Sequence, residues 1–180
     1  MQNRSLVKEV SMKDALRQVL DDCTSELDDI RSRMQNLRLD KARDYFTKYA
    51  LIKASGTIEF VFRSIVADYF ESLNSSQINY YLENTVRKGS LSASYDNMAN
   101  LLKKFDNNWS RCFKQNVQRR DDYQRLRDSS KSLVDNRHLF AHGRQPTATF
   151  EDIYGYYLDC LRLVEEFDSV VCNSNADGSA

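Results

Sequence analysis

The amino-acid sequence predicts an all-α fold, a helical bundle with a long N-terminal helix, and three observations favour it. The 180 residues include five glycines and one proline, fewer turn-forming residues than short strands joined by tight turns require. Apolar residues recur at spacings of three and four along the chain, which is the period of helices that bury one face. The length suits one domain with its own core.

The first predicted helix spans residues 5–37. Its apolar positions alternate spacings of four and three: Leu16, Leu20, Cys23, Leu27, Ile30, Met34 and Leu37. Such an a/d seam is typical of a helix that packs along another helix. That other helix belongs either to the same domain or to a second copy of the chain. We therefore separate an N-terminal unit, residues 1–38, from a helical domain over residues 39–172.

The second predicted helix runs from Asp40 to Leu73, with Gly56 in its interior, where a missing side chain permits close helix approach. One side of this helix is expected to carry its apolar residues: Tyr45, Tyr49, Ile52, Ile58, Phe62, Ile65 and Tyr69. Residues 74–76 (Asn-Ser-Ser) interrupt the pattern and can cap a shorter helix that runs to about Arg87. The Lys-Gly-Ser sequence at residues 88–90 is a stop signal.

Two short helices are expected over residues 94–105 and 109–117. A longer helix follows from Arg120 to His142, because Gly143 gives it a C-terminal cap and Pro146 lies just beyond.

The last helix is expected to begin at Thr149, whose hydroxyl can form a capping box with Asp152. It should run to about Cys172. Residues 173–180 are small and polar, so we expect them to be disordered.

Charge is unevenly distributed although the net charge is zero. Residues 103–144 carry eleven Lys or Arg against five Asp or Glu, whereas residues 145–180 carry one Arg against seven acids. Two explanations remain open at this point. Either two neighbouring helices face each other with opposite charge, or the basic segment binds a polyanion such as a nucleic acid.

The location of the protein is indicated by its cysteines and by its hydropathy. The four cysteines stand far apart without a CxxC pair, which favours reduced thiols in a cytoplasmic protein. No stretch approaches the roughly 18 apolar residues that span a bilayer. The N-terminus has no apolar region typical of a signal peptide.

The predicted helix that ends at Gly143 carries the candidate chemistry. At 100° per residue, Arg137 falls within the apolar stripe that should face the core: Leu126, Ser130, Leu133 and Phe140. A guanidinium remains charged in a protein and is costly to bury without partners. Arg137 therefore needs either a carboxylate partner or a place in a polar cleft.

A basic ridge lies on the adjoining face, formed by Arg127, Lys131, His138 and His142. Three interpretations fit these residues. The histidines can be surface residues near a helix C-terminus, where cations are favoured, beside an ion-paired Arg137. His138 and His142 share a face and can bind a metal, but no Cys or acidic pair supplies the remaining ligands that zinc needs. A histidine beside a charge-stabilising arginine can also perform acid–base catalysis.

Residues 137–142 read Arg-His-Leu-Phe-Ala-His and match the R-x4-H motif of the HEPN family, in which a polar residue usually follows the arginine. Glu59 and Arg63 resemble the Glu-x3-Lys/Arg element that some members carry on an earlier helix. The resemblance covers about residues 40–172 and is closest to the RiboL-PSP-HEPN type found in bacterial defence and toxin systems.

This resemblance implies a metal-independent endoribonuclease without a cofactor, acting as a homodimer whose motif helices meet in one cleft. His142 would be the base for the ribose 2′-OH, and Arg137 would stabilise the phosphorane. The supporting residues would be His138 and Asn136, which could hold the phosphate or fix the His142 tautomer, and Glu59 with Arg63. RNA would be bound by three cations: Arg127, Lys131 and Arg144. A regulatory antitoxin or sensor protein is a further expected partner, and a membrane is not.

Two alternatives stay open. Many HEPN-like domains bind RNA or proteins without cutting, so a non-catalytic module is the second hypothesis. Glu59 and Arg63 stand one helical turn apart and can form a simple surface salt bridge. Arg137 and His142 also lie about 140° apart on an ideal helix, so they converge only if the helix end distorts or a partner chain contributes.

Overall fold

The structure is a computed structural model that describes residues 12–35, 40–71 and 75–173. This part of the chain contains seven α-helices, one π-helical segment and no strand. The helices are α1 (Asp14–Gln35), α2 (Asp40–Glu71), α3 (Ser76–Leu82), the π-helical η1 (Glu83–Arg87), α4 (Tyr95–Phe105), α5 (Asn107–Gln118), α6 (Tyr123–Ala141) and α7 (Phe150–Asn173). The predicted all-α fold is confirmed.

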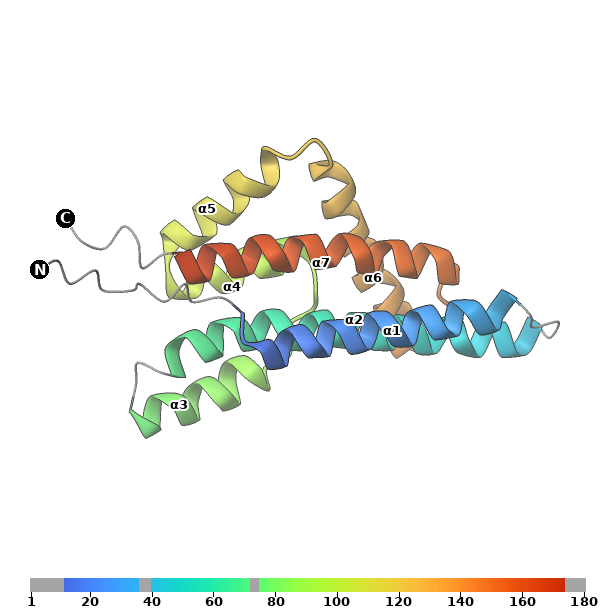
Figure 1. The fold of residues 1–180 in the computed structure, drawn as a ribbon, viewed down its shortest axis with the longest axis horizontal. Coiled ribbons are helices and arrows are strands. Elements are labelled where there is room, and N and C mark those ends of the chain that lie inside the picture. The colour runs from blue at the N-terminus through green and yellow to red at the C-terminus, as the bar shows by residue number, and fades with distance from the viewer. Residues whose placement is uncertain (1–11, 36–39, 72–74, 174–180) are drawn as a thin grey trace, which may run out of the picture.

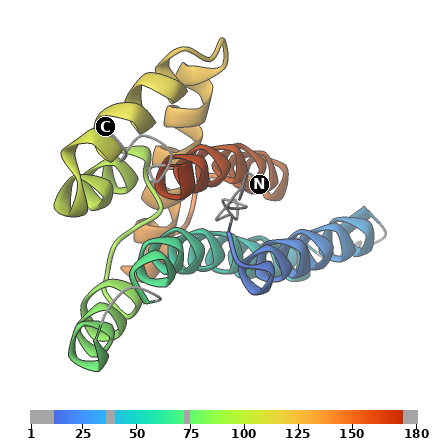
Figure 2. The same cartoon turned by 60° about the vertical axis from the view of Figure 1, so that its left-hand side comes forward.

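The long helices α1, α2 and α7 form the body of the molecule, with α2 packed against both of the others (Figure 1). Helix α6 crosses α7 steeply, and the C-terminal end of α6 reaches α2. Helices α4 and α5 form a pair beside α7, and α3 with η1 packs on the last part of α2 (Figure 2). The candidate helix α6 is therefore held by α7 along its length and by α2 near its end.

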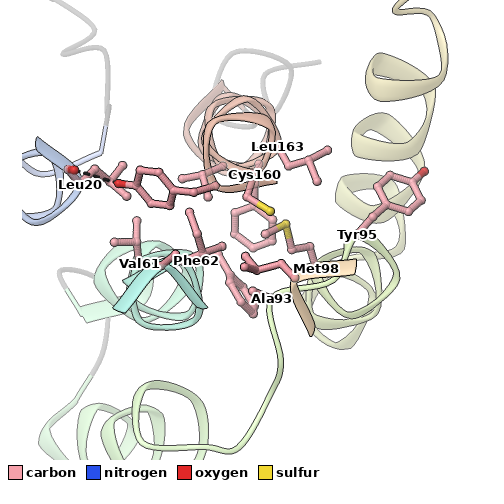
Figure 3. Packing of buried hydrophobic residues seen from close by; sticks show 14 of the residues in the cluster. Leu20, Val61, Phe62, Ala93, Tyr95, Met98, Cys160 and Leu163 are labelled. Atoms are coloured by element: carbon pink, nitrogen blue, oxygen red, sulfur yellow. Dashed lines mark hydrogen bonds between the residues drawn. The ribbon is translucent and has the colours of Figure 1, made fainter. Parts of the chain in front are cut away.

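The core lies where α2, α4 and α7 face one another (Figure 3). Phe62 of α2 makes an edge-to-face contact with Phe167 of α7, with ring centroids 5.8 Å apart. Phe113 of α5 makes a similar contact with Phe167, with ring centroids 5.9 Å apart. Tyr157 of α7 is fully buried, and its hydroxyl donates a hydrogen bond to the Leu20 carbonyl of α1 at 2.9 Å. This contact ties α1 to the same core.

The seam of α1 packs inside its own chain. Its six described apolar positions are all buried: Leu16, Leu20, Cys23, Leu27, Ile30 and Met34. Arg31 makes a bidentate ion pair with Glu151 at the start of α7. Of the two arrangements left open by the sequence, the structure has the intramolecular one.

The start of α1 differs from the prediction of a helix over residues 5–37. Residues 12 and 13 are not helical, and α1 begins at Asp14. Here the Met12 backbone N–H donates to the Asp168 carboxylate at 3.1 Å, so a contact with α7 replaces a helical bond. Residues 5–11, 36 and 37 lie outside the described residues, as does the predicted disordered segment 174–180.

The prediction that α2 carries seven apolar residues on one side is wrong for three of them. Ile58, Phe62 and Ile65 are buried, but Tyr45, Tyr49 and Ile52 are exposed. Positions 52 and 58 lie about 120° apart around an ideal helix, so they do not share a face. The N-terminal half of α2 instead buries Ala50, Leu51 and Ala54.

The helix predicted to reach Arg87 does so, but its last five residues are π-helical. Ser75 precedes α3 without the expected side-chain cap, so that detail of the prediction is wrong. At the opposite end, the guanidinium of Arg87 donates to Asp68 of α2 at 2.6 Å. This ion pair fastens the end of η1 to α2.

Helix α6 begins at Tyr123, not at Arg120. Arg120 stands in the preceding turn, where its guanidinium binds Asp122 at 2.9 Å and Glu166 of α7 at 3.0 Å. This partner from another helix was not visible in the local sequence pattern.

The start of α7 is confirmed as a capping box. The Asp152 N–H donates to the Thr149 hydroxyl at 3.2 Å, and the Thr149 N–H donates to the Asp152 carboxylate at 2.8 Å. None of the described helices is both long and apolar enough to cross a membrane.

Candidate functional site

The candidate site is built on the C-terminal end of α6. The helix ends at Ala141, and Gly143 takes the left-handed conformation with φ of 71°. The Gly143 N–H donates to the Phe140 carbonyl at 3.0 Å and the Arg144 N–H to the Leu139 carbonyl at 2.8 Å. This is a Schellman motif, so the glycine ends the helix as predicted. His142 is exposed at the C-cap position between Ala141 and Gly143.

The stripe of α6 that was expected to face the core does so only in part. Leu126, Ser130 and Leu133 are buried, but Phe140 is 36% exposed. The Ser130 hydroxyl accepts the Tyr95 N–H at 3.1 Å, which fastens this part of α6 to α4. After Asn136 the helix leaves the core, so the prediction is wrong for its last turn.

Arg137 is half-buried where α6 leaves the core. Within the described residues its guanidinium forms neither a hydrogen bond nor an ion pair. The Glu59 carboxyl of α2 lies near enough for the charge of Arg137 to lower its pKa. A permanent cation thus stands beside a carboxyl group, without direct pairing, at the edge of the core.

Glu59 is only 9% exposed. Burial raises the pKa of its carboxyl above the usual value, and the charges of Arg137, Arg63 and His138 offset part of that rise. The structure therefore brings together four of the predicted site residues, from α2 and α6.

The surface salt bridge that was the alternative for Glu59 and Arg63 does not form. The Arg63 Nε donates instead to the Glu59 backbone carbonyl at 2.7 Å. The guanidinium of Arg63 is half-buried, and burial lowers its pKa while the Glu59 charge opposes this. Glu59 is therefore buried near Arg137 and His138 of α6, whereas Arg63 is held against the Glu59 backbone.

Asn136 has a different task from the predicted one. It is buried, and its amide nitrogen donates to the Ser132 carbonyl at 2.9 Å. Its amide oxygen accepts the backbone N–H groups of Thr147 at 2.8 Å and Ala148 at 2.9 Å. The side chain is therefore occupied by the turn between α6 and α7. No hydrogen bond joins Asn136 to His142 here, and a role of Asn136 in holding phosphate stays a prediction.

The predicted basic ridge is exposed along its whole length: Arg127, Lys131, His138 and His142. Two of its cations are paired locally, since Arg127 lies 3.7 Å from Asp96 and Lys131 lies 2.6 Å from Asp135. Both line a pocket of about 300 Å³ that also contains Asp96, Asp128 and Asp135. These acids reduce the positive potential that phosphate groups would meet there.

Part of the uneven charge of the chain is explained by pairing between α7 and the segment that enters α6. Arg120 binds Glu166, Arg162 of α7 binds Asp122 at 2.7 Å, and Arg125 lies 3.4 Å from Asp159. The interpretation of oppositely charged neighbouring helices is supported for this region. Positive charge without such pairing is left at the other end of α6, on Arg137 and the exposed Arg144.

The interpretation of His138 and His142 as a metal site depends on further ligands near them. Among the described residues no group of three or more His, Cys, Asp or Glu side chains is placed to hold a metal ion. His138 and His142 thus have no third ligand of these types there.

A comparison with protein-family models gives one match, RiboL-PSP-HEPN, over residues 16–173. The chain therefore belongs to the RiboL-PSP-HEPN family. The match begins within α1, so it includes the N-terminal helix, which the resemblance seen in the sequence did not cover. Comparisons with curated proteins and with solved structures give no match.

Proposed function

We propose that this protein is a metal-independent endoribonuclease whose reacting groups are Arg137 and His142. The observation that carries the proposal is the half-buried Arg137, which has no ion-pair partner in the described residues and stands beside the buried Glu59. A cation held in this way is available for a phosphate group. The R-x4-H motif and the family membership support the same chemistry.

The proposed reaction is transfer of the phosphoryl group to the neighbouring ribose oxygen. The His142 imidazole accepts the proton of the 2′-OH, and the resulting oxygen attacks the adjacent phosphorus. The bond from phosphorus to the 5′ oxygen breaks, and that oxygen takes up a proton. The products are a 2′,3′-cyclic phosphate and a 5′-hydroxyl end. Arg137 stabilises the charge that builds up on the phosphorane oxygens.

Glu59 and Arg63 are proposed as positioning residues. The Glu59 carboxyl limits where the guanidinium of Arg137 can lie, because opposite charges attract most strongly at a partly buried position. Arg63 holds the backbone of the same turn of α2 through its bond to the Glu59 carbonyl. His138 adds a basic side chain close to Glu59. Arg144 is the best-placed of the predicted RNA contacts because its exposed side chain has no described ion pair.

The separation of Arg137 and His142 around α6 favours a shared site. The two residues lie about 140° apart on an ideal helix, so one phosphate group does not easily reach both within one chain. In a homodimer, Arg137 of one copy and the partner subunit's His142 can flank the same phosphate. A setting in bacterial defence or a toxin–antitoxin pair, with a protein regulator, accords with the family resemblance.

A non-catalytic RNA- or protein-binding module is the second candidate. One observation favours it: three acidic residues share the pocket of Arg127 and Lys131, which weakens RNA binding on that side of α6.

The experiment is RNA cleavage in EDTA by the wild type, Arg137→Ala and His142→Ala, with Arg33→Ala as the matched control. Arg33 is exposed and pairs only with Asp29 of its own helix among the described residues. We expect cleavage to be lost in the first two variants and retained in the control, with cyclic phosphate ends on the products. Cleavage that persists in both site variants, or the absence of cleavage by the wild type, would favour the binding module.

Mixing the two inactive variants tests whether the site is shared. If each site combines Arg137 of one copy with His142 of the other, half of the mixed population is heterodimeric and each heterodimer has one intact site. Activity should then return to about one quarter of the wild-type value. If both residues act within one chain, no activity should return.

A further inference from the structure

A pocket of about 370 Å³ lies beside the turn that follows the R-x4-H motif. It is found where the end of α1, the start of α2 and the start of α7 come together at one end of the molecule (Figure 1). We call it the α1–α2–α7 pocket. Its volume lies in the range of pockets that bind small ligands, so its lining can be examined for the chemistry of a ligand.

Two of the three cations that line this pocket are already paired. Arg31 binds Glu151 through two hydrogen bonds, and Lys48 lies 2.6 Å from Asp44. Arg43 is exposed, and its guanidinium forms neither a hydrogen bond nor an ion pair within the described residues. The positive charge that the pocket offers to a ligand is therefore a single guanidinium.

The rest of the lining favours a flat, neutral ring over a phosphate group. The carboxylates of Asp44 and Glu151 line the pocket, and they repel an anion but accept hydrogen bonds from N–H groups. Met34, Pro146 and Phe150 supply an apolar wall, against which a planar base can lie. A nucleobase has both the flat faces and the polar edges that these residues require.

Among the nucleobases, guanine fits the unpaired Arg43 best. A guanidinium pairs bidentately with the O6 and N7 acceptors of guanine, and this is the commonest base-specific contact of arginine. Adenine carries an amino group where guanine has O6, so the same arginine would face a donor. The Watson–Crick edge of guanine carries N–H donors, and the Asp44 carboxylate of the same pocket can accept them.

The turn after α6 links this pocket to the candidate site. Gln145 lines the pocket, and its side chain donates to Asp44 at 2.8 Å. Gln145 follows His142 by three residues, so their Cα atoms lie at most about 11 Å apart. The Thr147 N–H in the same turn is bound by Asn136 of α6. A base in the pocket can therefore belong to the RNA on which His142 acts.

We propose that the α1–α2–α7 pocket binds the base of a guanine nucleotide of the RNA, close to the phosphate that is cleaved. The inference rests on the proposed function, because it names the nucleotide that directs the nuclease to its cleavage position. Arg43 and Asp44 set the specificity, and Gln145 holds the pocket beside the site. The guanine must be single-stranded, since both of its polar edges are bound.

Base preference is tested by binding, so that no cleavage is needed. The full chain with His142→Ala is titrated with short single-stranded RNAs that differ only in one central base, and fluorescence anisotropy is measured at a fixed salt concentration. We expect guanine to bind at least about tenfold more tightly than adenine. Adding Arg43→Ala should remove this difference. Adding Arg33→Ala should keep it, because Arg33 is an exposed arginine outside the pocket.

Equal affinities for the guanine and adenine RNAs would overturn the proposal, as would a guanine preference that survives Arg43→Ala. Arg43 is exposed, so the variant should remain folded, and circular dichroism checks this. A preference for adenine or for a pyrimidine would equally contradict the assignment of Arg43.

A free guanine nucleotide is the main rival source of the same base, and GMP is the probe for it. We expect GMP to bind about a hundredfold more weakly than the guanine RNA, because a longer RNA also contacts the end of α6 and gains from both contacts at once. GMP that binds as tightly as the guanine RNA would assign the pocket to a free nucleotide and overturn the proposal.

The pocket and the nuclease can fail separately. If the wild type cleaves RNA, the cuts should lie at a fixed distance from single-stranded guanines, and Arg43→Ala should lose this pattern. Cleavage without any relation to guanine removes the pocket from the site and retains the nuclease. A guanine preference that depends on Arg43, in a wild type that does not cleave, retains the pocket and removes the nuclease.

Discussion

The two ends of α6 meet different surroundings although they belong to one helix. In its N-terminal and middle turns, Leu126 and Leu133 are fully buried and neighbouring charges pair with α7. At its C-terminal end, Phe140 and His142 are exposed and Arg137 stands beside Glu59 without an ion pair among the described residues. The first end provides stability through satisfied contacts, whereas the second carries the residues proposed to bind and cleave RNA. Substitutions at the two ends should therefore separate stability from activity.

The largest effect is expected for His142→Ala. Loss of a general base should lower RNA cleavage about a hundredfold to ten-thousandfold, measured as initial rates in EDTA. The free energy of unfolding should change by less than about 0.5 kcal/mol because the side chain is exposed. A variant that is inactive because it is unfolded would contradict the contrast between the two ends.

The next prediction compares the loss of packing at a buried and at an exposed position of α6. Leu133→Ala should lower the free energy of unfolding by about 2–5 kcal/mol, since it leaves a cavity at a fully buried position. Phe140→Ala, a larger truncation on the same helix, should cost much less because Phe140 is exposed. Urea denaturation followed by circular dichroism would measure both. Equal losses would mean that the end of α6 is packed as tightly as its start.

Asn136→Ala tests the boundary between the two ends. It removes the acceptor of the Thr147 and Ala148 N–H groups, which should cost about 1–3 kcal/mol. Amide exchange at these two residues should speed up more than exchange in α1. Unchanged protection at Thr147 would show that the turn does not depend on this side chain.

Gly143→Ala should have a smaller effect of about 1 kcal/mol, because alanine at φ of 71° is strained. Gly56→Ala is its matched control. The backbone of Gly56 is helical and has free space, so alanine there should stabilise the folded protein. Thermal melting of both variants should show shifts of opposite sign.

The smallest expected effect concerns Glu59, and it depends on pH. Its pKa is raised in the folded state, so the folded protein binds the proton more tightly than the unfolded chain does. Stability should therefore fall as the pH rises from about 4.5, the ordinary value for glutamate, through the folded-state pKa. Glu59→Gln should remove this fall, and melting curves between pH 4 and 8 would detect it. A pH dependence that is identical in the variant would assign it to other groups.

Local chemistry explains which features were predictable. The α1 seam, the Thr149–Asp152 capping box and the Gly143 helix end depend on residues within one or two turns, and all three are present in the structure. Arg137 and His138 were singled out by their positions on the predicted helix, and Glu59 and Arg63 through the family resemblance. The structure brings the four residues together. Their roles in catalysis remain proposals.

Other features depend on contacts between distant segments. The start of α6 was missed because Arg120 binds Glu166, 46 residues away. The exposure of Tyr45, Tyr49 and Ile52 reflects which face of α2 the other helices cover, and this is not encoded in α2 alone. The hydrogen bonds of the Asn136 side chain are made to a turn, whose sequence has no regular period. A buried asparagine in a helix shortly before a proline-containing turn is the signal that could have indicated it.

The bond from Asn136 to the turn also limits how the chain can evolve. The Asn136 side chain and the Thr147 backbone, eleven positions apart, close a ring of fixed size. An inserted or deleted residue within that ring would move the amide groups away from their acceptor and shift His142 and Arg144 together. Members of the family that retain this asparagine should therefore keep the spacing from the asparagine to the last helix constant, and length variation should accumulate in other connections.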